Sequence, residues 1–126
     1  MSSAKHKTLI DLLISKTAKG EISWRQTIDE DSYKVDFARH SLKLTYIDTS
    51  ERGDAECIVT LINEQGQEAD SFTDSDLDDH SKPNPSEKYY WFRKMKELFL
   101  SARRSALGSD KVLDEIMNEL GDDIPF

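Results

Sequence analysis

The sequence contains very few of the residues that build disulfide scaffolds or metal centres. Its only cysteine is Cys57, so an intramolecular disulfide is excluded, and the apolar run that follows it predicts a buried side chain rather than a reactive thiol. The three histidines, His6, His40 and His80, stand at no zinc-ligand spacing from one another or from Cys57. We therefore expect no metal centre in this protein.

Glycine and long apolar stretches are also scarce. The five glycines are isolated from one another, so the chain has no glycine-rich phosphate loop, and we expect no cofactor. No segment reaches the roughly 18 apolar residues that cross a bilayer. Asp11 interrupts the apolar run near the N-terminus, where a signal peptide needs a continuous one. We therefore expect a cytoplasmic protein that does not associate with membranes.

Catalytic signatures are missing in the same way. The scattered histidines form no Ser-His-Asp or Cys-His arrangement, and no carboxylate pair among 25 acidic residues stands out as a general acid and base. Asp74, Asp76 and Asp78 have the opening spacing of an EF-hand calcium loop, but Asp79 stands where that loop needs glycine and Pro85 where it needs glutamate. The sequence therefore predicts no catalytic residue and no enzyme.

The sequence does contain apolar residues at helical and at strand spacing, and their order along residues 1–126 predicts one α+β domain. Helical spacing of apolar residues after Ser3 predicts a first helix that ends at Gly20. Alternating patterns then predict a hairpin over 22–28 and 33–37, a third strand over 42–46, an interior fourth strand over 57–62 and a weaker edge strand over 67–72. We expect these four or five strands to form an antiparallel meander.

The C-terminal part is expected to be helical after an exposed acidic loop at about residues 73–85. A long helix follows, with Trp91 in the core like Trp24 of the hairpin, and it ends at Gly108. A final helix is expected to turn its apolar residues inward: Val112, Leu113, Ile116, Met117 and Leu120. The predicted fold class is therefore α+β, with an N-terminal helix, an antiparallel sheet of four or five strands, and two C-terminal helices packed on one face of the sheet.

Short motifs punctuate these elements. They are Thr17-x-x-Gly20-x-Ile22-x-Trp24 after the first helix, Asn63-Glu64-x-Gly66 in the sheet, and Ala102-Arg103-Arg104 before a last helix that contains Leu113. With these motifs the chain resembles small bacterial and phage α+β proteins of uncharacterised function. The resemblance covers most of the chain and implies a bacterial or phage origin, but it transfers no active site.

Charge is sorted into blocks along the chain. From Asp48 to Asp79 there are eleven acidic residues and one basic residue, whereas Lys88 to Arg104 contains six basic residues and one acidic residue. Basic side chains share one face of the long helix with two leucines, which is the pattern of a contact surface with a polar rim. We expect these residues to bind a partner: Arg93, Lys96, Leu100, Arg103, Arg104 and Leu107 on the helix, and Asp74, Asp76, Asp78 and Asp79 in the loop. The alternative is that the basic side chains pair with the acidic loop or the last helix of their own chain.

The charge balance also bears on the class of partner. A formal net charge of -8 disfavours direct binding to nucleic acid. The sequence predicts a small acidic intracellular protein that acts by protein–protein interaction, self-association included. Two alternatives stay open: a phage-type inhibitor or nucleic-acid mimic whose acidic surface blocks a partner, and a small-molecule-sequestering protein or small enzyme with a pocket between sheet and helices.

Overall fold

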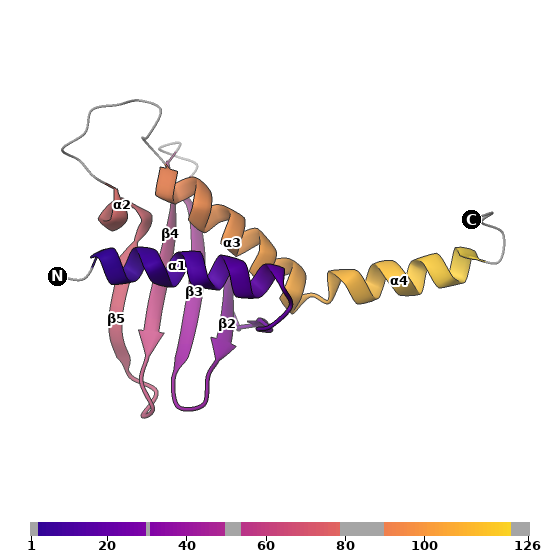
Figure 1. Cartoon of the computed structure of the whole chain (residues 1–126), viewed down its shortest axis with the longest axis horizontal. Helices are drawn as coiled ribbons and strands as arrows, with labels where there is room; N and C mark the ends of the chain where they lie inside the picture. Colours follow the sequence, from indigo (N-terminus) through magenta and orange to yellow (C-terminus); the bar gives the residue numbers. More distant parts are fainter. Residues whose placement is uncertain (1–2, 30, 50–53, 79–89, 122–126) are drawn as a thin grey trace.

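The structure of the chain is a computed structural model that describes residues 3–29, 31–49, 54–78 and 90–121. A first helix precedes a five-stranded antiparallel sheet, and two long helices form the C-terminal part (Figure 1). The α+β fold class is therefore confirmed. The elements are α1 (Ser3–Ala18), β1 (Arg25–Gln26), β2 (Ser32–Asp36), β3 (Ser41–Thr49), β4 (Asp54–Ile62), β5 (Glu68–Thr73), α2 (Asp74–Leu77), α3 (Tyr90–Ala106) and α4 (Ser109–Leu120).

The sheet is a meander in which each strand pairs with the next one along the chain, as predicted. Leu44 of β3 lies opposite Tyr33 of β2 and Val59 of β4, so one row of buried residues crosses the sheet. β4 lies between two neighbouring strands, in agreement with its apolar character. The alternation of side chains along each strand therefore builds one apolar face.

The first hairpin differs from its prediction. Only the two residues Arg25–Gln26 form β1, and Ile28, which the alternating pattern placed in the strand, is fully exposed. The reason is local: the Asp29 backbone N–H donates to the Thr27 hydroxyl, and the Ser32 backbone N–H donates to the Asp29 carbonyl. The chain is therefore already turning towards β2 at Thr27.

Helices α1 and α3 cover one face of the sheet, and the core lies between them and the strands (Figure 1). Lys94 of α3 forms an ion pair with Asp11 of α1, which joins the two helices outside the core. The buried apolar side chains are Ile10, Leu13, Trp24, Tyr33, Val35, Leu42, Leu44, Cys57, Val59, Phe72, Leu77, Met95, Leu98, Phe99 and Ala102. No apolar side chain of α4 belongs to this core.

Trp24 joins three parts of the fold. It is 4 % exposed, its indole Nε1 donates to the Thr17 hydroxyl of α1 at 3.0 Å, and its backbone N–H donates to the Ser105 hydroxyl of α3 at 3.1 Å. Its predicted burial is therefore confirmed. Trp91, at the start of α3, is less buried than Trp24: it packs against the core, and the Lys94 ammonium lies 4.5 Å from its ring centroid.

Cys57 is a free, fully buried cysteine of β4, as its apolar run predicts. Burial, reinforced by the nearby Asp74 carboxylate, raises the pKa of its thiol to about 12. Because the thiolate is the reactive form, a thiol with this pKa stays neutral and unreactive near neutral pH. The residue therefore serves packing and provides no nucleophile.

The acidic segment that begins at Thr73 is more ordered than predicted. Residues Asp74–Leu77 form the short helix α2, and Thr73 and Asp76 close a capping box in which each side chain accepts from the backbone N–H of the other. Asp74 and Leu77 are buried. The expected loop is therefore a helix over Asp74–Leu77, in which Ser75 and Asp76 are exposed, as expected, but Asp74 and Leu77 are not. Residues 79–85 lie outside the described part of the chain.

The position of α4 is the largest departure from expectation. Both C-terminal helices form, but α4 leads away from the body of the domain, and its main contacts are with the end of α3 (Figure 1). Gly108, between the two helices, has the left-handed backbone conformation, with φ of 66°. The prediction that the apolar side chains of α4 face inward is wrong, because this connection carries them past the core. No described helix, α4 included, is long and apolar enough to cross a membrane.

Candidate interaction surface

The apolar side chains of α4 form an exposed stripe along one side of the helix. Positions three and four residues apart lie on one face of a helix, so these side chains are neighbours on the surface. Their exposed fractions run from 40 % for Met117 to 61 % for Leu120. We call this set the α4 stripe: Val112, Leu113, Ile116, Met117 and Leu120.

Acidic residues flank the α4 stripe. Around the helix, Asp110 and Asp114 lie beside Met117, and Glu119 lies beside Val112 on the other side of the stripe. The helix has four acidic residues and one basic residue, Lys111, which reaches Glu115 at 4.0 Å on the polar side. The α4 stripe is therefore an apolar strip between negatively charged edges.

A second exposed stripe runs along α3 on the side turned away from the core. Its members fall on one side of the helix and its last turn, and all six are exposed: Arg93, Lys96, Leu100, Arg103, Arg104 and Leu107. We call this set the α3 stripe. Leu100 and Leu107 are 46 % and 45 % exposed, and Arg103 and Arg104 form no ion pair with any residue that the structure describes. The predicted helix surface is therefore accessible as a contiguous strip.

The four predicted acidic loop residues do not form a comparable surface. The Asp74 carboxylate accepts from the backbone N–H of Cys57 at 2.9 Å, and Asp76 is part of the α2 cap. Asp78 is half-buried, and its Oδ1 atom has no hydrogen-bond partner within the described residues. Asp79 lies outside the described residues. At least two of these carboxylates therefore serve the fold rather than a surface for partners.

Asp74 supports a testable prediction about the fold. Replacing it with Ala leaves the buried Cys57 N–H unpaired, which is expected to lower the free energy of unfolding by about 1–3 kcal/mol. Asp74→Asn keeps an acceptor oxygen at the same place, so its loss is expected to be smaller. Urea unfolding of the two variants and the wild type measures the difference. Equal losses in both variants would contradict a role for this hydrogen bond.

The pH dependence of Asp74 has a definite sign. Burial raises the pKa of its carboxyl above the ordinary value, while the hydrogen bond from Cys57 acts in the opposite direction. The folded protein therefore holds this proton more tightly than the unfolded chain, so protonation favours folding. Relative to Asp74→Asn, the wild type is expected to gain stability as the pH falls from neutral towards the ordinary carboxyl pKa of about 4.

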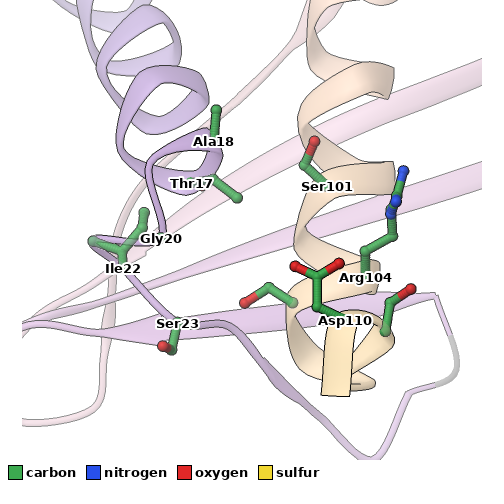
Figure 2. A pocket seen from close by; sticks show the side chains of 10 residues that line it. Thr17, Ala18, Gly20, Ile22, Ser23, Ser101, Arg104 and Asp110 are labelled. Carbon is green, nitrogen blue, oxygen red and sulfur yellow. The ribbon is translucent and has the colours of Figure 1, made fainter. Parts of the chain in front are cut away.

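A cleft of about 390 Å³ lies between the C-terminal ends of α1 and α3 (Figure 2). Two of its hydroxyl groups, those of Thr17 and Ser105, already accept hydrogen bonds from Trp24. Arg104 and Asp110 also line it, so its two charged groups have opposite sign. The polar groups of the cleft therefore serve the fold in part and do not converge on one kind of ligand.

The other chemically distinctive side chains are also structural. His6 of α1 contacts Asp70 of β5 at 2.9 Å and stacks on Phe72 with ring centroids 4.0 Å apart, which fixes α1 over the sheet edge. Within the described residues, no group of three or more His, Cys, Asp and Glu side chains could hold a metal ion. The outer sheet face places Lys34, Lys43 and Thr60 side by side, so its central row is polar. The two helical stripes are the strongest candidate surface.

Comparisons of the chain with protein-family models, with curated proteins and with solved structures find no match. Sequence reasoning identified the α3 stripe but assigned the α4 stripe to the core. An amphipathic helix has the same period whether its apolar side faces a core or a partner, so the period cannot separate the two cases. The signal that bears on the difference is Gly108, whose position after only one residue beyond α3 permits a change of direction without a long loop.

Proposed function

We propose that this protein is a non-enzymatic binding protein that recognises another protein through the α4 stripe. The observation that carries the proposal is the exposure of five large apolar side chains on one helix that adds nothing to the core. Contiguous exposed apolar patches on soluble proteins mark interaction sites. Burying each such side chain completely is worth roughly 1.5–3 kcal/mol, so a partner that covers the stripe gains most of its affinity there.

The shape and charge of α4 describe the surface that it binds. An amphipathic helix docks by laying its apolar side into a groove, with anchors at positions three, four and seven residues apart. Leu113, Ile116 and Leu120 have this spacing, and the edges of the stripe are acidic. The complementary partner surface is therefore an apolar strip with basic edges, because opposite charges at the rim favour the correct partner and repel others.

The two alternative functions have less support. The acidic segment from Asp74 would be the surface of a nucleic-acid mimic, but Asp74 and Asp76 are engaged in hydrogen bonds within the domain. A small-molecule binder needs convergent polar groups, but Thr17 and Ser105 of the cleft are bonded to Trp24. We further propose a reducing, cytoplasmic compartment, to which a free buried Cys57 is suited, and no direct binding to nucleic acid.

Site-specific photo-crosslinking tests the proposed surface. A photoreactive amino acid replaces Met117 on the α4 stripe, and a matched variant carries it at Lys111, which is exposed on the polar side of the same helix. On irradiation of cells that produce the protein, we expect covalent products with another polypeptide chain from position 117. Position 111 is expected to give few or none.

The crosslinking result distinguishes a binding surface from a merely exposed one. If position 117 forms no product, or if positions 117 and 111 form the same products with the same yield, the α4 stripe is not the binding surface. Circular dichroism of both variants shows whether α4 stays helical when the photoreactive residue is introduced.

A further inference from the structure

We infer that the partner of the α4 stripe is the α3 stripe of a second copy of this chain. In this dimer, α4 of each copy packs against α3 of the other copy. This inference rests on the proposed function, because it names the partner of the same surface. It is carried by the charges of the two stripes, by the spacing of their leucines, and by the direction in which α4 leaves the domain.

The two helices have opposite charge. Helix α4 contains four acidic residues and one basic residue, whereas α3 contains five basic residues and only Glu97 as an acidic one. Two α4 helices packed against each other would bring their acidic edges together, which opposes association. An α4 helix on an α3 helix instead places acidic edges beside Arg103 and Arg104, which form no ion pair with the described residues of their own chain.

The apolar parts of the two stripes have the same repeat. Leu100 of α3 and Leu107, the residue after α3, are seven residues apart, and so are Leu113 and Leu120 of α4. All four are between 45 % and 61 % exposed. A repeat of seven is the spacing with which two packed helices keep one side in contact, so antiparallel helices can pair Leu107 with Leu113 and Leu100 with Leu120.

The connection at Gly108 favours a second copy over the chain's own α3. Only Leu107 and Gly108 separate the two helices, and α4 extends beyond the end of α3 instead of folding back along it (Figure 1). A two-fold axis near this connection would place each α4 antiparallel to the α3 of the other copy, and the same contact would then form twice. In the inferred dimer, each α4 stripe covers the α3 stripe of the other copy while Gly108 keeps its observed conformation.

A charge-swap experiment on the full-length protein tests this arrangement. Variant A carries Asp114→Lys and Glu119→Lys on α4, and variant B carries Arg103→Glu and Arg104→Glu on α3. Sedimentation velocity measures the mass of each variant, of the wild type and of an equimolar mixture of A and B. We expect a wild-type dimer whose dissociation constant rises with salt.

Each variant alone is expected to dissociate at least about 100-fold more readily, because identical charges then face each other in both contacts. Mixing A with B is expected to restore a dimer, since the basic α4 of A faces the acidic α3 of B and the unchanged pair remains complementary. A chain that carries all four substitutions is expected to dimerise by itself. Circular dichroism of each variant shows whether the loss of mass reflects dissociation of a folded protein.

Three results would overturn the inference: a monomeric wild type, unchanged dimers in A and B, or no dimer in the mixture of the two folded variants. These results separate the inference from the proposed function. A crosslink from position 117 to a different protein, together with a monomeric wild type, would contradict the homodimer and support the binding function. If position 117 forms no crosslink and the wild type is monomeric, both the homodimer and the proposed function are wrong.

Discussion

Replacing Trp24 with Ala is expected to lower the free energy of unfolding by about 3–5 kcal/mol, through the lost burial and the cavity that remains. The indole is 4 % exposed and lies where the C-terminal end of α1, the strand β1 and the last turns of α3 meet. The substitution removes both the ring and the hydrogen bond from Nε1 to Thr17. Urea unfolding followed by far-ultraviolet circular dichroism measures the change.

Two matched substitutions separate the contributions at this position. Trp24→Phe keeps much of the ring but loses the Nε1 donor, so its loss is expected to be smaller than that of Trp24→Ala. Trp91→Ala removes the other indole, which is only partly buried, so it is also expected to lower the free energy of unfolding by less than Trp24→Ala does. If Trp24→Ala and Trp91→Ala unfold at the same urea concentration, then Trp24 does not hold the helices and sheet together as described.

Replacing Leu113, Ile116 and Leu120 with glutamine is expected to abolish partner binding while the domain stays folded. Full burial of such a side chain contributes roughly 1.5–3 kcal/mol to the binding free energy. Even if the partner buries the three side chains only in part, their summed contribution exceeds the ~2.8 kcal/mol that corresponds to a 100-fold weaker complex. The domain itself loses nothing comparable, since α4 contains no buried residue. Substitutions at such surface positions usually change stability by less than about 0.5 kcal/mol.

The matched control changes the other side of the same helix. Lys111→Gln, Glu115→Gln and Asn118→Gln together introduce the same residue type at three exposed positions away from the stripe. Affinity is measured by titration calorimetry with the protein that crosslinks to position 117, whether that is a second copy or another chain. Equal loss of affinity in both triple variants would show that the apolar character of the α4 stripe is not what the partner recognises.

The sequence by itself determined where most elements form and which side of each is apolar. The helical spacing of Ile10 and Leu13 and the terminal Gly20 define α1, because period and helix-end signals are local properties of the chain. Alternation placed Leu42 and Leu44 on the buried side of β3 for the same reason. The exposed α3 stripe could also be predicted, since it lies opposite the apolar arc of its helix.

Only the tertiary structure decided what covers each apolar side and which charges are free. Asp74 belongs to an acidic run, but its carboxylate is buried because the turn after β5 brings it to the backbone of Cys57, 17 residues earlier in the chain. The α4 helix has the periodicity of a core helix, but the left-handed Gly108 directs it away from the sheet. The hydrophobic period shows which side of a helix is apolar. The direction that the backbone takes at the ends of the helix determines whether the core or a partner buries that side.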